Sequence, residues 1–317
     1  MRHFTSVNDV TNIDELVDTA LKIKSSPLSQ ATLGKGKTMG IIFLNPSLRT
    51  RLSTQLAAQN LGISPIVMNF SSDGWQLEFE DGVVMDGNKA EHVKEAAAVI
   101  GSYFDIIGIR SFPKFESRED DYEDQVLSQF IKHAGVPVVS LESAIRHPLQ
   151  SLADLVTIKE NLIVDKTPKI VLSWAPHPRA LPQAVANSFS EWILKAGYSL
   201  TITHPEGYEL AESFIQGATI EYNQNKAFED ADFIYAKNWS SYKDYGKILS
   251  TDKNWQIDNL KMQLTNQAYF LHCLPVRRNV VVSDKVIDSP QSIVIKQAAN
   301  RLFAAQAVLA TLLKDNF

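Results

Sequence analysis

The sequence lacks residues that several common kinds of protein depend on. It has one cysteine, Cys273, among 317 residues, which excludes an intrachain disulfide and any zinc site made of several cysteines. No apolar run approaches the ~18 residues of a membrane-spanning helix, and the charged N-terminal stretch has no apolar core of a signal peptide. We therefore expect a cytoplasmic protein with no membrane partner and no bound metal.

Glycine and excess positive charge are also scarce. The net charge is −5, so no basic field favours nucleic acid as a partner. The chain has 14 glycines, and its Gly-Lys-Gly-Lys-Thr run at residues 34–38 resembles the end of a nucleotide-binding P-loop. That motif would need its first glycine where Ala31 stands, and it follows a strand, whereas this run precedes one. We expect a solvated basic turn here and no nucleotide.

The chain does contain an ordinary apolar fraction, 44%, and enough length for two domains. In its first half, apolar runs of the buried type alternate with stretches of helical periodicity, which is typical of a doubly wound parallel sheet. The predicted strands are 38–44, 65–70, 105–110 and 137–140, and the predicted helices are 13–24, 49–61, 92–103 and 122–133. Residues 71–90 are predicted to form a long ordered loop.

The same alternation restarts in the second half. The predicted strands are 168–174, 199–203, 231–237 and 268–274, and the predicted helices are 152–161, 184–195 and 292–314. We expect the long last helix to return and pack on the first half. The sequence therefore predicts an α/β protein with two doubly wound parallel-sheet domains: residues 1–150, completed by the C-terminal helix 292–317, and residues 151–291.

One strand-to-helix junction carries chemistry. The apolar run ending near residue 44 is followed by Asn45-Pro46 and then by Ser47-Leu48-Arg49-Thr50-Arg51. A helix start offers unpaired backbone N–H groups and a partial positive charge, and hydroxyls and guanidinium groups add donors suited to phosphate. The junction predicts a phosphate or multiply anionic ligand; the alternative is a capped helix with exposed arginines.

Two further polar residues follow neighbouring predicted strands. Arg110 ends one strand, and His147 follows the next by a short turn. In open α/β sheets such strand ends line the ligand crevice. His147 could donate to a carbonyl oxygen and stabilise its developing charge, and Gln150 offers an acceptor for an amide N–H₂. Taken alone, a histidine in this position is more often a structural hydrogen-bonding group.

The run His272-Cys273-Leu274-Pro275 closes a predicted strand of the second half. Its backbone carbonyls, forced outward before the proline, could hold an amine or N–H₂ group. The alternative is that Cys273 is a small buried apolar residue. We do not expect Cys273 to act as a nucleophile, because no neighbouring group in the sequence argues for a lowered thiol pKa.

Together these motifs resemble a known family over essentially the whole chain. Phe-x-x-Pro-Ser-x-Arg-Thr-Arg, Arg110, His-Pro-x-Gln and His-Cys-Leu-Pro, in this order and spacing, are similar to the aspartate/ornithine carbamoyltransferases. The resemblance implies carbamoyl transfer from carbamoyl phosphate without a cofactor. It also implies a homotrimer with active sites at subunit interfaces, and a chain knot in the second domain. In that knot, the loop 176–182 would surround the segment after Lys237.

Within the family, the chain resembles the enzymes that act on N-acylated ornithines in arginine biosynthesis. The Ser-Met-Gly signature that serves free ornithine is missing from residues 235–241, whereas residues 174–183 and 272–280 match the acylornithine type. Acylation removes the α-ammonium, so no acidic partner for it is needed. A succinyl group adds a carboxylate, which Arg278 could bind through a bidentate pair.

Two positions bear on the acyl group. The position of Ala90 is glutamate in the acetyl type and proline in the succinyl type, and a glutamate would repel a succinyl carboxylate. The acetyl type also has a lysine where this chain has Val281. Both positions favour N2-succinyl-L-ornithine as acceptor, with N-acetyl-L-ornithine as the alternative. A more remote alternative is a non-catalytic anion-binding protein on the same fold.

The resemblance assigns site residues by position, and the domains would bind carbamoyl phosphate and the acylornithine respectively. Carbamoyl phosphate would be contacted by Ser47, Leu48, Arg49, Thr50, Arg110, His147, Gln150, Cys273, Leu274 and Arg301. The acylornithine would be held by Trp75, Ala90, Glu142, His177, Lys237 and Arg278. Trp75 would come from a neighbouring subunit, or else anchor its own loop; Lys237 could instead be a solvated charge at a strand end.

The same resemblance assigns catalytic roles. Arg110, His147 and Thr50 would stabilise the oxyanion of the tetrahedral intermediate, and Arg49 would stabilise the leaving phosphate. No side chain is an obvious general base, so the phosphate itself could take the proton of the attacking amine.

Overall fold

The computed structural model describes residues 1–162 and 166–317. The chain separates into two compact units, one made of Met1–Leu149 with Arg301–Phe317 and the other of Gln150–Asn300. Each unit contains a parallel sheet between helices, so the α/β prediction is confirmed. Among the described residues, no helix is long and apolar enough to cross a membrane.

The first unit is built on a four-stranded parallel sheet in the order β2-β1-β5-β6. Its strands are β1 (Thr38–Phe43), β2 (Ser64–Asn69), β5 (Ile106–Arg110) and β6 (Val138–Glu142). Strands β5 and β6 are buried along their whole length, as expected for a parallel sheet covered on both faces.

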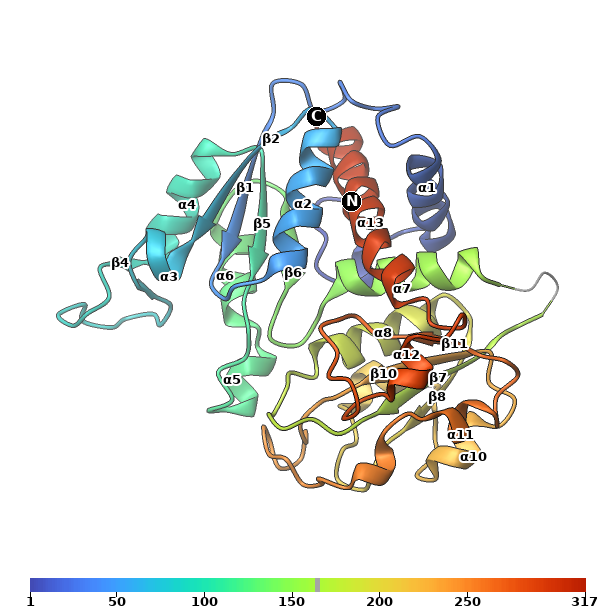
Figure 1. Ribbon diagram of the computed structural model, residues 1–317. Helices are drawn as coiled ribbons and strands as arrows, with labels where there is room; N and C mark the ends of the chain where they lie inside the picture. The colour runs from blue at the N-terminus through green and yellow to red at the C-terminus, as the bar shows by residue number, and fades with distance from the viewer. Residues whose placement is uncertain (163–165) are drawn as a thin grey trace. The chain divides into compact units, whose positions relative to one another are not determined.

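Helices cover the two faces of this sheet (Figure 1). On one face lie α4 (Val93–Tyr103) and α6 (Gln125–His133), whose apolar side chains form a core with those of β1 and β5. On the other face, α2 (Leu48–Asn60) lies beside the C-terminal helix α13 (Val294–Asn316). Asn60 of α2 donates to the side chain of Gln306 on α13, at 3.2 Å. The part of α13 from Arg301 onward therefore belongs to the first unit, whereas its first residues belong to the second unit.

The remaining helices of this unit are short or lie at its N-terminus. They are η1 (Val7–Asp9), α1 (Ile13–Ser25), α3 (Phe70–Asp73) and α5 (Arg118–Tyr122). The single predicted helix 122–133 is wrong in one respect, because α5 and α6 are separate helices. Asp124 stands between them with a φ of 49°, a left-handed conformation that no continuous helix contains.

The predicted long loop after β2 is ordered by two short strands. Strands β3 (Leu77–Glu78) and β4 (Glu91–His92) pair in parallel, and the segment between them extends away from the sheet (Figure 1). The carboxylate of Glu78 holds the segment, because it accepts from its own neighbours' backbone and from Lys89 at 2.9 Å. These hydrogen bonds lower the pKa of Glu78 to about 2.

The second unit has a five-stranded parallel sheet in the order β11-β10-β7-β8-β9. Its strands are β7 (Lys169–Trp174), β8 (Ser199–Thr203), β9 (Thr219–Ile220), β10 (Phe233–Lys237) and β11 (Tyr269–Leu271). Its helices are α7 (Pro148–Glu160), α8 (Ala184–Lys195), α9 (Glu212–Ile215), α10 (Gln224–Phe228), η2 (Lys253–Trp255), α11 (Asn259–Met262) and α12 (Asp284–Ile287), with the first residues of α13.

Helix α7 starts at Pro148, four residues before the predicted start at residue 152. Proline is favoured in the first turn of a helix, where its missing N–H is not needed. His147 therefore immediately precedes a helix, and Gln150 lies in its first turn rather than in a preceding loop.

The segment after β10 is bonded to the loop that the sequence expected to surround it. The backbone N–H of Ser240 donates to the carbonyl of Leu181 at 3.0 Å, and the side chain of Asn238 donates to Ala175 at 2.7 Å. The indole of Trp174 donates to the carbonyl of Trp239 at 3.0 Å. The knot itself stays a prediction of the resemblance.

Candidate active site

The carboxyl ends of three neighbouring strands bring the predicted residues of the first unit together. Phe43 at the end of β1 is in register with Arg110 at the end of β5. The register between β5 and β6 shifts after Ile109, and this irregularity places Arg110 opposite Glu142. The residues that the sequence placed at strand ends therefore lie along one edge of a single sheet.

Ser47 begins the helix that follows β1. It is the N-cap of α2, with extended backbone, and its hydroxyl accepts from the backbone N–H of Thr50 at 3.4 Å. The Nε atom of Arg49 is buried and has no hydrogen-bond partner among the described residues. A buried guanidinium N–H at a helix start is a donor that an anion can satisfy. The buried Nε of Arg49 supports the phosphate interpretation, whereas the cap at Ser47 and the exposed Arg51 are features that the alternative also expected.

Arg301, assigned to the site by resemblance, reaches the same motif from α13. Its Nη2 donates to the hydroxyl of Thr50 at 2.6 Å, and both residues are buried. Two segments 251 residues apart in the chain therefore meet in one buried contact. Sequence spacing could not have predicted this contact.

Arg110, Glu142 and His147 form a buried charged cluster. Nη1 of Arg110 donates to Oε2 of Glu142 at 2.7 Å, and Nε2 of His147 lies 3.5 Å from the same oxygen. The guanidinium of Arg110 also lies over the ring of Phe112, 4.4 Å from its centroid. Nε of Arg110 is buried without a hydrogen-bond partner in the described chain. Glu142, which was assigned to the acylornithine, thus orients two of the predicted oxyanion donors.

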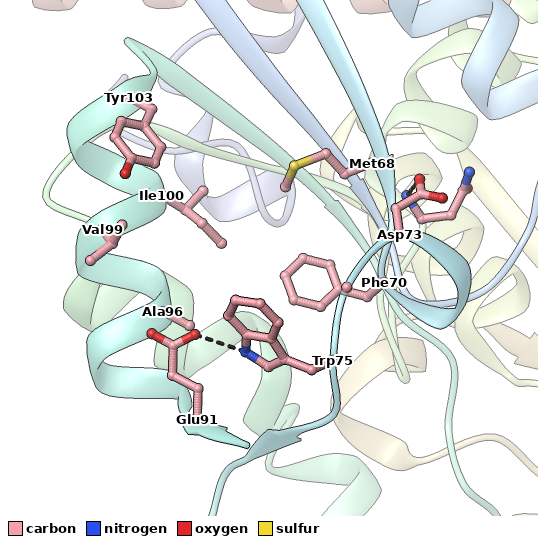
Figure 2. Close-up of a pocket in the computed structure, with 11 residues that line it drawn as sticks. Met68, Phe70, Asp73, Trp75, Glu91, Ala96, Val99, Ile100 and Tyr103 are labelled. Atoms are coloured by element: carbon pink, nitrogen blue, oxygen red, sulfur yellow. Dashed lines mark hydrogen bonds between the residues drawn. The ribbon is translucent and has the colours of Figure 1, made fainter. Parts of the chain in front are cut away.

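Trp75 and Ala90 lie at opposite ends of the extended loop. The indole of Trp75 donates to Glu91 at 2.9 Å, and the backbone N–H of Ala90 donates to Gln76 at 3.1 Å. Trp75 is nevertheless 58% exposed. Figure 2 shows it at the edge of a largely apolar cavity of about 410 Å³, with Phe70 beside it and α4 opposite.

Lys237 ends β10 of the second unit and is 9% exposed, so it is not a solvated strand-end charge. No carboxylate among the described residues pairs with it. Burial lowers the pKa of His177, and the nearby charges of Arg277 and Lys237 lower it further. Nε of Arg277 donates to Nε2 of His177 at 3.1 Å. Nδ1 of His177 lies 3.0 Å from the carbonyl oxygen of Arg179 and 3.1 Å from its backbone nitrogen. The cationic surroundings suit an anionic ligand.

The His272 to Pro275 turn follows β11, which is shorter than predicted. Leu274 has a φ of 53°, a conformation that is costly for a residue with a side chain. Its backbone N–H donates to Nδ1 of His272 at 2.9 Å, and the Leu274–Pro275 peptide bond is cis. Cys273 is buried.

Arg278 is engaged by carboxylates of its own segment. Its guanidinium donates to both oxygens of Asp288, at 2.7 and 2.6 Å, and to Asp284 at 2.9 Å. These hydrogen bonds raise the pKa of Arg278 above its usual value. The side chain predicted to bind a succinyl carboxylate thus already has a bidentate partner in this structure.

Sequence reasoning missed several residues that hold the predicted ones. Asp154 and Gln297 are fully buried and hydrogen-bonded to each other, and Asp154 also accepts from Gln150 at 2.7 Å. Asp154 stands four residues after Gln150 on α7, a spacing that places both on one helix face and could have indicated the pair. Over residues 1–162 and 166–317, no group of three or more metal-ligating side chains is found.

The fold and this site define a class: α/β proteins of two units, with buried arginine Nε atoms at the carboxyl ends of parallel strands. Two family profiles match the chain, the carbamoyl phosphate-binding domain over residues 2–160 and the Asp/Orn-binding domain over residues 182–312. The chain belongs to the aspartate/ornithine carbamoyltransferase family, as the motifs indicated, and the expected carbamoyltransferase class is confirmed.

Curated relatives cover almost the whole chain. The N-succinylornithine carbamoyltransferase of Bacteroides fragilis is 55% identical over 99% of this chain and 99% of its own. The N-acetylornithine carbamoyltransferase of Xanthomonas campestris pv. campestris is 37% identical over 98% of each chain. Relatives with the succinyl name are therefore more similar than those with the acetyl name.

Solved structures agree in fold. An N-acetyl-L-ornithine transcarbamylase with one glutamate replaced by alanine, in complex with carbamyl phosphate and N-succinyl-L-norvaline, superposes with a TM-score of 0.93 at 36% identity. The match covers 98% of this chain and 100% of that structure's chain. Acetylornithine transcarbamylase complexed with acetylcitrulline has the same TM-score and identity, with 98% of this chain and 99% of that one covered.

Proposed function

We propose that the protein transfers the carbamoyl group of carbamoyl phosphate to the δ-amine of N2-succinyl-L-ornithine. The products would be N-succinyl-L-citrulline and phosphate. We propose that this reaction is a step of arginine biosynthesis and that it takes place in the cytoplasm. The observation that carries the proposal is the high identity to N-succinylornithine carbamoyltransferases, 55% and 53% over nearly full length. Lys237 supports it, because this lysine is buried and pairs with no carboxylate among the described residues, so an anionic acceptor would satisfy its charge.

In the first unit, we assign phosphate binding to the start of α2. Ser47, Leu48 and Arg49 would surround the phosphate oxygens, with the unpaired Nε–H of Arg49 as a directed donor. Thr50, already hydrogen-bonded to Arg301, would lie next to the reacting carbonyl. The leaving phosphate would thus depart into a site rich in donors.

The buried cluster of Arg110, Glu142 and His147 supports a role in stabilising the intermediate. When the amine attacks the carbonyl carbon, the carbonyl oxygen becomes an oxyanion, and Arg110 and His147 would donate to it. Glu142 fixes both side chains before the substrate arrives, so little reorganisation is needed during the reaction. The phosphate would accept the proton of the amine.

In the second unit, we assign the carbonyls of Cys273 and Leu274, with Gln150, to the carbamoyl N–H₂. His177, Lys237 and Arg278 would bind the carboxylates of the acylornithine. Arg278 would release Asp288 and bind the succinyl carboxylate instead, so that one bidentate carboxylate pair replaces another. Trp75 and Ala90 would lie next to the acyl group of the substrate bound by a neighbouring subunit.

The acyl group is the point on which the main and alternative proposals differ. Ala90 is exposed and bears no charge, so it presents no repulsion to a succinyl carboxylate. The test is a side-by-side measurement of kcat/KM with ornithine, N-acetylornithine and N-succinylornithine at saturating carbamoyl phosphate. The proposal expects the succinyl compound to be preferred; preference for the acetyl compound would support the alternative, and preference for ornithine would refute both.

We also propose the homotrimer, and an apolar stripe on α2 supports it. Leu48, Leu52 and Leu56 follow one another at four-residue spacing and are 70%, 58% and 45% exposed. Ile66 on the edge strand β2 is a further exposed apolar side chain, at 51%. Contiguous exposed apolar side chains of this kind mark protein interfaces.

Sedimentation velocity tests the trimer. The protein should sediment as a trimer, and Leu52→Asp should shift it to monomers because a charge would be desolvated in the interface. The matched control is Leu260→Asp on α11 of the second unit, where the leucine is 72% exposed; this variant should remain trimeric. A monomeric wild-type protein would overturn the proposal.

A further inference from the structure

A buried hydrogen-bond network lies behind the turn that would hold the carbamoyl N–H₂. Its centre is Oδ1 of Asp154 on α7, which accepts from Nε2 of Gln150 and from Nε2 of Gln297, both at 2.7 Å. All three side chains are at most 1% exposed. Most polar groups so deeply buried are hydrogen-bonded, and these hydrogen bonds restrict the geometry of the side chains that make them.

Gln297 connects this centre to the turn. Its Oε1 accepts from the backbone N–H of His272 at 2.8 Å, while its Nε2 donates to Asp154. The ring of His272 in turn accepts from the backbone N–H of Leu274, which has the left-handed φ of 53°. A continuous chain of hydrogen bonds therefore runs from Asp154 to the residue whose carbonyl is assigned to the substrate.

Asp154 also determines the orientation of the side-chain amide of Gln150. A carboxylate oxygen carries no proton and can only accept, so the atom of Gln150 facing Oδ1 of Asp154 must be its N–H₂. Its Oε1 is then the atom left for a ligand, and it accepts from no described residue. An amide oxygen in this place can accept from an N–H₂ group but cannot donate to a carbonyl.

Tyr235 on β10 lies next to this network. It is fully buried beside Asp154 and Cys273, and burial with these neighbours raises the pKa of its hydroxyl well above the usual value. The phenol therefore stays protonated and adds no second negative charge near Asp154.

We propose that Asp154 and Gln297 are positioning residues that orient Gln150 and the Cys273-Leu274 carbonyls toward the carbamoyl N–H₂. The inference rests on the proposed function, because that N–H₂ belongs to the proposed substrate. Neither residue touches the substrate; each acts through a residue that does. The expected consequence is selectivity for a carbamoyl over an acetyl group.

The test compares the dissociation constants of carbamoyl phosphate and acetyl phosphate, which has a methyl group in place of the N–H₂. Gln297→Met removes both hydrogen bonds at nearly constant volume. Carbamoyl phosphate should then bind about tenfold more weakly, the effect of roughly one or two net hydrogen bonds, while acetyl phosphate should bind within about twofold of wild type. Equal weakening of both ligands, or of neither, would overturn the inference.

The matched control is Gln306→Met on the same helix. Gln306 is also fully buried, and its amide bridges Asn60 and the carbonyl of Pro27. This variant should lose stability but keep the preference for carbamoyl phosphate. If this variant also loses the preference, the loss follows from any buried substitution in α13, and the inference fails.

A second variant adds a pH readout. Gln297→Glu places a carboxyl against Asp154, and two carboxyls in contact share one proton. With the proton present, the pair reproduces the original hydrogen bonds, so carbamoyl phosphate should bind nearly as in wild type at low pH and more weakly as pH rises. A pH-independent loss would count against the inference.

These binding measurements do not require turnover. If the wild-type enzyme binds carbamoyl phosphate but carbamoylates no acylornithine, the proposed acceptor is wrong while the positioning role is still tested. If wild type shows no preference for carbamoyl over acetyl phosphate, the positioning role itself is wrong.

Discussion

Replacing Arg110 should cost stability as well as turnover, because of where its partner lies. Arg110 and Glu142 are 6% and 7% exposed and 2.7 Å apart. Arg110→Met keeps most of the side-chain volume but leaves the Glu142 carboxylate buried without its guanidinium. Removing one member of a buried ion pair typically costs about 3–5 kcal/mol, so the free energy of unfolding should fall by about that amount.

The double variant Arg110→Met with Glu142→Gln separates the two effects. It removes both charges, so it should recover at least half of the lost stability in urea denaturation. Its turnover should stay low, since one oxyanion donor is worth about 10²–10³ in kcat. A single variant as stable as wild type would refute the buried-pair argument, and a double variant that regains turnover would refute the catalytic role of Arg110.

Three further predictions concern the acyl group, the unpaired lysine and acid stability. Ala90→Glu should lower kcat/KM for the succinyl compound about tenfold or more relative to the acetyl compound, because of charge repulsion; an unchanged ratio would refute the role of this position. Lys237→Met should raise KM for the acylornithine about tenfold or more without lowering the melting temperature, since no carboxylate in residues 1–162 and 166–317 pairs with the lysine; a strongly destabilised variant would show that the lysine is structural. Burial lowers the pKa of His204 below 6.5, so the unfolded state binds the proton more readily and stability should fall as pH drops below about 6.5. His204→Phe should reduce the fall in melting temperature between pH 7.5 and 5.5, and an identical fall in both proteins would contradict this.

The sequence predicted the sheet scaffold and the residues at its strand ends for one physical reason. Buried parallel strands need continuous apolar runs, so a polar residue directly after such a run, such as Arg110, is conspicuous and has a known location. The ends of helices were harder to predict. The predicted start at residue 152 followed the apolar pattern, whereas α7 starts at Pro148, because proline is favoured in the first turn of a helix.

The supporting interactions could not be predicted, because they join residues far apart in the chain. Gln297 and Asp154 are separated by 143 positions, and neither residue type is usually buried. The burial of Lys237 was missed for a similar reason, since a lysine at a strand end is ordinarily solvated. The local pairing of Arg278 with Asp288 was not predicted either, because the four-residue helix α12 between them is too short to show a periodic pattern.

The central claim is that N-succinylornithine accepts the carbamoyl group. The most direct measurement is mass spectrometry of the reaction between carbon-13-labelled carbamoyl phosphate and an equimolar mixture of ornithine, N-acetylornithine and N-succinylornithine. The account predicts that the label appears predominantly in N-succinylcitrulline, with one phosphate released per label transferred. Label predominantly in citrulline or N-acetylcitrulline, or phosphate release without a labelled product, would contradict it.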